Sequence, residues 1–257
     1  MKITAKGLRN TIGAVSVVAL LGGCAATHVA LSKKDLDVQA RTSTAVFVDP
    51  VPREKRTIYL EVKSGVMEFD RRKFKQFVSE QFTQFNDNQY KIVDDPDTAQ
   101  FQMVVYVLNL EKASPSAAEA ALNQGYMGGS VAGGAAIGAV GATVNNNSPW
   151  AGAAVGGVVG GAAELISGAL VKDVTYMLVS DVQIKEKAAK GVIVRKDSKI
   201  DAKISDAGSS QQTVSEVGNK KEYRTRIVTT ANKANLKLEE AEELMFKKAA
   251  YAMAGFF

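Results

Sequence analysis

The feature that most constrains the fold is a long stretch without charge. No Asp, Glu, Lys or Arg occurs from residue 120 to residue 163, a run of 44 residues, although 23% of the chain is charged. A Gly-rich segment in water is usually a flexible linker, and such linkers are rich in Gly and Ser. This stretch instead mixes Gly with Val, Ile and Ala. It is therefore either a low-complexity tether or a segment that lies outside water.

Polar turn residues divide the stretch into two segments of helical length. Asn145, Asn146 and Asn147 precede Ser-Pro and form a turn signal, which leaves 126–144 and 150–171 on either side. As helices these segments would be roughly 28–33 Å long, close to the apolar thickness of a bilayer. Their glycines recur at i, i+4 spacing, the small-xxx-small pattern by which membrane helices pack. These glycines are Gly129, Gly133, Gly134, Gly138, Gly152, Gly156, Gly157, Gly160 and Gly161.

An aromatic residue opens each segment, Tyr126 in the first and Trp150 in the second. Aromatic residues are enriched at both interfaces of a membrane, so these two are expected interface anchors. The pattern predicts a transmembrane helical hairpin over 126–171, with the three asparagines in a surface loop. Because Gly and Ala make each helix only weakly apolar, several hairpins would have to pack together in a homo-oligomer. A buried Gly/Ala-rich hairpin and a disordered loop are the open alternatives.

Glu164 departs from the pattern because it is a charge late in the second segment. It is interpreted either as part of a ring of carboxylates in an oligomer or as a solvated helix end, which we favour.

The first 23 residues have the pattern of an export signal. Three basic residues precede an apolar run over 11–21, which is shorter than the roughly 20 residues that span a bilayer. The ending Leu-Gly-Gly-Cys resembles the lipobox of bacterial lipoproteins and implies acylation, including palmitate, at Cys24. Ala25 follows instead of the Asp that retains such proteins in the inner membrane, which implies the outer membrane. The alternative is an ordinary signal peptide with a chance cysteine.

Composition excludes several kinds of site. Cys24 is the only cysteine, so a disulfide framework is absent, and His28 is the only histidine. A His-based catalytic triad and a multi-His metal site are therefore impossible, and neither a Walker loop nor a phosphate-binding glycine loop occurs. Removal of residues 1–23 lowers the formal charge from +5 to +2 and weakens the case for nucleic-acid binding. We expect no enzyme, no metal and no cofactor beyond the covalent lipid on Cys24.

Strand and helix patterns flank the uncharged stretch. Helical spacing of apolar residues predicts helices over 69–86, with a buried phenylalanine face, and over 238–256. Arg224 and Arg226 alternate on one predicted strand face, which we expect to be exposed, with a binding role as the alternative. Residues 206–211 and 217–221 carry turn signals that separate the strands of a predicted meander. The predicted strands are 44–50, 57–64, 90–95, 101–111, 174–187, 192–204 and 222–238.

Together these elements predict an α+β fold, a mixed α/β domain with an inserted Gly-rich transmembrane helical hairpin. Residues 1–23 would be the signal peptide, and 24–44 the lipidated N-terminus and tether. Residues 45–125 and 172–257 would form one split periplasmic domain. The glycine-zipper hairpin, 126–171, would lie in the outer membrane.

Four segments resemble the TraT family of outer-membrane lipoproteins. They are SKKDLDVQARTSTAVFVDP, GYMGGSVAGGAAIGAVGA, VKDVTYMLVSDVQIKEKA and EYRTRIVTTANKANLKLEEA. The last two are more specific, because glycine zippers recur in unrelated proteins.

The resemblance implies a surface-exposed homo-oligomer that gives complement (serum) resistance and conjugative surface exclusion. It would act by blocking complement components or a factor on the surface of a mating cell, not by catalysis. An oligomeric lipoprotein pore or secretion component, and a structural envelope lipoprotein, are the alternatives.

Overall fold

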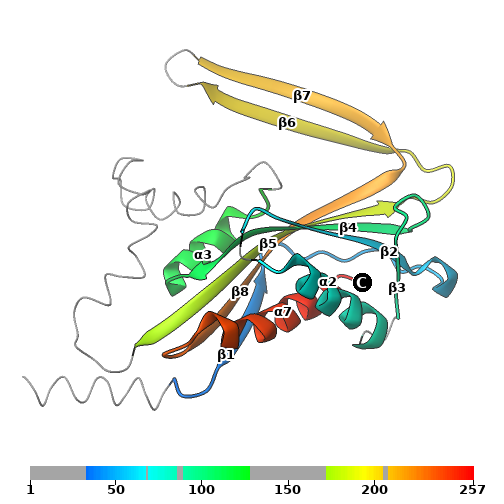
Figure 1. Ribbon diagram of the computed structural model, residues 1–257. Helices are drawn as coiled ribbons and strands as arrows, with labels where there is room; N and C mark the ends of the chain where they lie inside the picture. The colour runs from blue at the N-terminus through cyan, green and yellow to red at the C-terminus, as the bar shows by residue number, and fades with distance from the viewer. Residues whose placement is uncertain (1–32, 68, 86–88, 128–171, 205–207) are drawn as a thin grey trace, which may run out of the picture.

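The fold is built on a six-stranded mixed β-sheet. A computed structural model describes residues 33–67, 69–85, 89–127, 172–204 and 208–257. Within these residues the strand order is β1-β8-β5-β4-β2-β3 (Figure 1). Strand β2 is parallel to β3 and β4, and the other neighbours are antiparallel. The strands are β1 (Asp37–Thr42), β2 (Thr57–Ser64), β3 (Lys91–Val93), β4 (Phe101–Lys112), β5 (Asp173–Lys187) and β8 (Lys220–Ala234).

The longest strands form the centre of the sheet. Strand β5 pairs with β8 along all 15 of its residues, and with β4 on its other side. Strand β4 comes before residues 128–171 in the sequence and β5 comes after them. The chain therefore leaves the sheet and returns to it at neighbouring strands.

Two helices, α2 (Arg71–Glu80) and α7 (Leu238–Ala254), cover one face of the sheet, and a π-helical turn (Gln81–Phe85) continues α2. Asp70 caps α2 by accepting the backbone N–H groups of Arg72 and Lys73, both at 3.0 Å. A short 3₁₀ turn (Arg53–Lys55) precedes β2. Buried aromatic and aliphatic side chains fill this layer; the largest are Phe74, Phe82, Phe101, Phe246, Ile58, Leu60, Met103, Leu178, Ile184 and Ile227.

A third helix, α3 (Pro115–Gln124), lies on the opposite face. Ser114 caps it by accepting the N–H of Ala117 at 3.2 Å, and Pro115 occupies the first turn, where a missing N–H costs little. The helix ends at Gly125, whose φ of +66° favours glycine. A second, smaller core forms here from Leu108, Ala118, Ala121, Met177, Val179 and Val228.

A separate hairpin projects from the ends of β5 and β8. Strands β6 (Val194–Ile204) and β7 (Gly208–Gly218) pair only with each other in the part of the chain that the structure describes. Figure 1 shows this hairpin extending away from the six-stranded sheet. We call these two strands the β-arm.

Most of the predicted elements are confirmed. Strand 57–64 has the predicted bounds, and five further strands and both helices occur within a few residues of their predicted positions. The strand predicted at 44–50 is wrong, because these residues are irregular. The predicted meander is also wrong, because 208–218 is a strand and β8 pairs with β5 instead of β6. Helix α3 was not predicted.

The predicted fold class, with an inserted transmembrane helical hairpin, is wrong. The described residues form a curled mixed sheet with three α-helices, and none of these helices is long and apolar enough to cross a membrane. The predicted hairpin lies outside the described residues from position 128 onward. Its prediction depended on glycine spacing, and Gly and Ala have little apolar surface with which to favour transfer out of water.

Two threonines of β8 allow a matched test of how a buried hydroxyl group affects stability with and without a hydrogen bond. Thr225 and Thr229 share the face toward α7, and both are buried. Thr225 Oγ1 donates to the Thr44 carbonyl at 2.9 Å, whereas Thr229 Oγ1 has no hydrogen-bond partner among the described residues. We expect Thr229→Val to raise the free energy of unfolding by up to about 1 kcal/mol, and Thr225→Val to lower it by about 1–2 kcal/mol. Urea denaturation measures both; equal losses would contradict this assignment.

Candidate functional site

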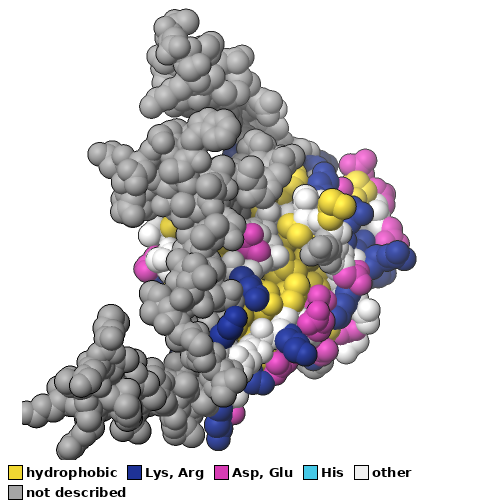
Figure 2. Space-filling model, turned by 60° about the vertical axis from the view of Figure 1, so that its left-hand side comes forward, with side chains coloured by type: hydrophobic (Ala, Val, Ile, Leu, Met, Phe, Trp, Pro, Cys, Tyr) yellow, Lys and Arg dark blue, Asp and Glu magenta, His cyan; other side chains and the backbone are white. Residues whose placement is uncertain are grey.

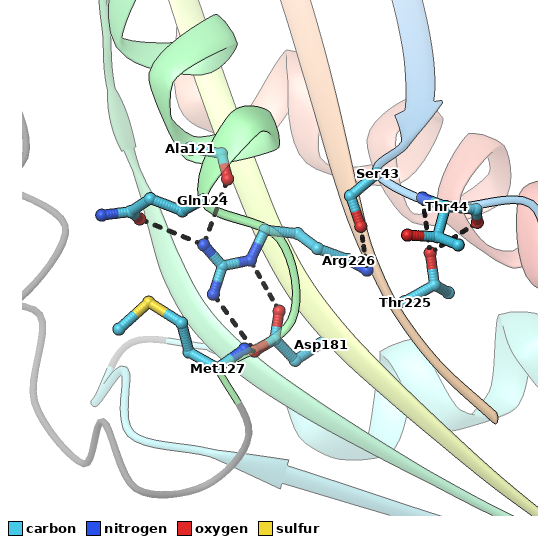
Figure 3. A network of polar contacts seen from close by, with 8 residues as sticks. All are labelled: Ser43, Thr44, Ala121, Gln124, Met127, Asp181, Thr225 and Arg226. Atoms are coloured by element: carbon cyan, nitrogen blue, oxygen red, sulfur yellow. Dashed lines mark hydrogen bonds and ion pairs between the residues drawn. The ribbon is translucent and has the colours of Figure 1, made fainter. Parts of the chain in front are cut away.

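A buried ion pair joins the neighbouring strands β5 and β8, the two longest strands of the sheet. Asp181 and Arg226 lie opposite each other in the register, and both side chains have 0% exposure. Arg226 Nε donates to Asp181 Oδ1 at 2.6 Å, and Nη2 donates to Oδ2 at 3.1 Å (Figure 3). Burial of a charge is costly unless it is paired and hydrogen-bonded, and a two-bond Arg–carboxylate contact meets both conditions.

The same pair binds the chain where it leaves α3. Arg226 Nη1 donates to the carbonyl of Ala121 at 3.1 Å and to Oε1 of Gln124 at 3.2 Å, while Asp181 Oδ2 accepts the N–H of Met127 at 2.7 Å. Carbonyls in the last turn of a helix lack helical partners and carry partial negative charge, so a guanidinium is a suitable donor there. The pair therefore fixes residues 121–127, which lie immediately before residues 128–171 in the sequence.

Arg224 makes a second contact to this segment. Its guanidinium lies 5.4 Å from the ring centroid of Tyr126, and its Nε donates to Glu222 at 2.7 Å. Burial raises the pKa of Tyr126 to about 12, against a smaller opposing effect of the positive charge on Arg224. Arg224 itself is exposed, unlike Arg226 two residues later.

The other end of 128–171 is also bound to β8. The N–H of Lys172 donates to Oδ1 of Asn235 at 2.9 Å, and the N–H of Asn235 donates to the Lys172 carbonyl at 2.8 Å. Asn235 follows β8 directly and has a φ of +53°, a conformation that Asn tolerates better than most residues. We call Asp181, Arg226, Arg224, Tyr126 and Asn235 the insertion base, because they hold both ends of residues 128–171 to the sheet.

The end of the edge strand β1 is fixed at the same position. The N–H of Ser43 donates to the Arg226 carbonyl at 2.8 Å, and the N–H of Arg226 donates to Oγ of Ser43 at 3.0 Å. The next residues repeat the contact, with Thr44 and Thr225 exchanging two hydrogen bonds. Figure 3 shows that these contacts and the ion pair converge on consecutive residues of β8.

A polar groove of about 280 Å³ lies between α3 and β1. Its charged lining comprises Lys33, Asp37, Arg41, Glu119 and Asp173. The lining carries both signs of charge, so the groove favours no single class of ligand.

The interactions of the insertion base are structural, because they hold the chain to the sheet. The Arg226 and Asp181 side chains are engaged with each other and with neighbouring backbone and amide groups. In the described ranges, no group of three His, Cys, Asp or Glu residues could hold a metal ion. The site therefore supports a structural role for these residues.

The structure describes only one of the predicted site residues. Tyr126 packs beneath Arg224, as above, and its role as a membrane-interface anchor stays a prediction. Arg226 was expected on an exposed face with Arg224, and this is wrong because Arg226 is fully buried. Its partner Asp181 was missed; its position within a strongly apolar strand, VTYMLVSDVQI, was the available signal. Cys24, the nine spaced glycines, Trp150, Asn145, Asn146 and Asn147 lie outside the described residues.

The fold and the insertion base define a mixed-sheet domain that holds both ends of a long insertion, 128–171, in which Glu164 is the single charged residue. Residues 35–257 match the family described as enterobacterial TraT complement resistance protein, and the chain belongs to this family. The resemblance inferred from the four sequence segments is confirmed. The family is one of complement resistance proteins and is not a known enzyme family.

Relatives match along nearly the whole chain. A TraT complement resistance protein of Escherichia coli is 34% identical over 240 residues, which are 93% of this chain and 94% of the relative. Another from the same species is 32% identical over 243 residues, 95% of this chain and 96% of the relative. One from Escherichia coli strain K12 is 32% identical over 246 residues and covers 95% of both chains.

The two arginines of the insertion base form a matched pair for mutation. Arg226→Met leaves the Asp181 carboxylate buried without its cation, which we expect to lower the free energy of unfolding by about 3–5 kcal/mol. Arg224→Met removes only an exposed ion pair and ring contact, so its cost should stay below about 1 kcal/mol. Chemical denaturation of both variants measures the difference. Similar costs for both would show that Arg226 is not the essential partner.

Tyr126 gives a pH-dependent test of the same site. Its folded pKa of about 12 exceeds the ordinary value near 10, so its stabilising contribution is complete below pH 10 and declines as pH rises toward 12. Unfolding free energy should therefore fall more steeply over this window in the wild type than in Tyr126→Phe. The two denaturation profiles, measured from pH 8 to 11.5, make the comparison. Parallel profiles would contradict the raised pKa.

Proposed function

We propose that this protein gives complement resistance at the bacterial envelope, as a lipid-anchored homo-oligomer that blocks its target without catalysis. The observation that supports this function is the family match over 35–257, which extends through both parts of the sheet and the insertion between them. The relatives whose printed description is complement resistance protein also match this chain nearly from end to end.

The proposed lipid on Cys24 would keep the domain close to the outer membrane. Eight residues, 25–32, lie between this cysteine and the first described residue, Lys33. At no more than about 3.3–3.6 Å per residue, they would allow at most roughly 30 Å between the acyl chains and the sheet. The domain would therefore act within a layer next to the membrane surface, where complement components assemble.

The arrangement of side chains favours blocking by contact. The buried charged groups of the insertion base, Asp181 and Arg226, bind each other, so they offer the target no reactive group. Figure 2 shows apolar side chains at the centre of one face of the described body, with charged side chains around them. An apolar centre with a polar border is typical of protein interfaces, as is expected for self-association or for contact with a complement component.

Survival in serum tests the proposal. A serum-sensitive strain would carry an empty vector, the wild-type gene, Cys24→Ala, or the control Ala26→Ser, which leaves the proposed acylation site intact. We expect the wild type and Ala26→Ser to raise survival at least tenfold over the vector, and Cys24→Ala to lose most of this gain because the domain is no longer held at the membrane. Heat-inactivated serum and immunoblots of the outer-membrane fraction control for complement dependence and expression. Equal survival of vector and wild-type cells at matched expression would overturn the proposal.

The same strains separate the related functions. Surface exclusion, proposed as a second effect of the same blockade, would appear as reduced recipient efficiency in conjugation. Entry of small dyes into wild-type cells, without a gain in serum survival, would instead favour an oligomeric pore. Detergent sensitivity of a deletion strain, with unchanged serum survival and mating, would favour a structural envelope lipoprotein.

A further inference from the structure

The β-arm is a hairpin without a supporting layer. Its strands pair from Val194↔Gly218 to Ile204↔Gly208, and neither strand makes an extensive contact with another described element. An isolated two-stranded hairpin is at best marginally stable in water. Each of its strands also has one edge without a partner strand in the described chain. The arm therefore requires a further partner to be stable as a projecting element.

Apolar side chains are exposed where the arm joins the sheet. Ile193 is 75% exposed and Val217 is 72% exposed, and Val192 beside them is 47% exposed. Exposed apolar groups that cluster at one position mark interaction surfaces more often than scattered ones do. These exposed apolar side chains therefore lie next to the open strand edges of the arm and enlarge the surface that a partner could contact.

The six-stranded sheet has a matching open edge at β1. Within the described chain, this strand pairs only with β8. The N–H of Ser43 points inward to Arg226, and inward and outward residues alternate in an antiparallel pair. The backbone groups of Val38, Ala40 and Thr42 therefore point outward. An edge of this kind is a template for another strand.

We propose that the β-arm of one copy pairs with the β1 edge of a second copy of this chain. This inference rests on the homo-oligomer of the proposed function and assigns its contact surface. The arm and β1 lie on opposite sides of the body (Figure 1), so an arm does not reach its own β1 edge. A second copy offers both the arm and the edge, so in a closed head-to-tail ring every copy has its β1 edge and one edge of its arm paired, whereas an unrelated partner would cover only one of these.

Removal of the arm tests this contact. In full-length lipoprotein purified in detergent, residues 194–218 would be replaced by Asn-Gly, which forms a tight hairpin turn between Ile193 and Asn219. The N–H of Ala188 donates to the Asn219 carbonyl at 2.8 Å below this junction, so the six-stranded sheet should stay folded. We expect light scattering to give an oligomer for the wild type and a monomer for the variant, with similar circular dichroism.

A substitution on the accepting edge provides an independent test. Ala40→Pro removes an outward N–H without a bond in the β1–β8 ladder, and Ala40→Ser is the control that keeps it. We expect Ala40→Pro to raise the concentration at which the oligomer dissociates at least tenfold, and Ala40→Ser to leave it unchanged. A monomeric wild type would overturn the homo-oligomer itself. An oligomer that survives both arm removal and Ala40→Pro would overturn only the arm-to-edge contact, and serum survival would still test the proposed function separately.

Discussion

The buried contact between Asp181 and Arg226 is the interaction on which the arrangement of this protein depends. It lies between strands β5 and β8, at the end of β1 and beneath the end of α3. A buried ion pair of this kind contributes less to net stability than well-packed apolar residues could. Its geometry, however, satisfies one helix carbonyl, one amide side chain and one backbone N–H at once. The gain is a defined path for the chain, because these contacts hold the end of α3 and the residues that follow it against β5 and β8.

This definition matters because the insertion interrupts a sheet at its centre. Strands β4 and β5 are adjacent, yet 60 residues separate Lys112 from Asp173 in the sequence. Closing so long a loop has an entropic cost, but this cost grows only slowly with loop length. Helix α3 and the Lys172–Asn235 contact fix those ends on β8. The described contacts therefore hold the chain to the sheet both before and after the insertion.

The sequence predicted the parts of the fold that periodicity controls. Alternation in 57–64 and helical spacing in 238–256 both report a single buried face, so both elements occur where expected. Helix α3 was missed because its small alanines merge into the uncharged stretch, and β7 was missed because Gly, Ser and Gln at its start are typical of turns. The ion pair was missed for another reason: Asp181 and Arg226 are 45 residues apart, and only the β5–β8 register brings them together.

The glycine pattern shows where this kind of reasoning fails. The spacing of small residues indicates that two helix backbones could approach each other closely. It does not indicate whether they would do so in lipid or in a protein interior, because Gly and Ala are compatible with both. The transmembrane hairpin required a second property, enough apolar side-chain area, that the spacing does not supply. The two arginines of β8 give more direct information about the protein around them. Arg226 is buried and Arg224 is exposed on the same strand, and both contact residues 121–127. Residues 121–127, which precede the insertion, are thus held by charged residues of a kind that the uncharged stretch itself lacks.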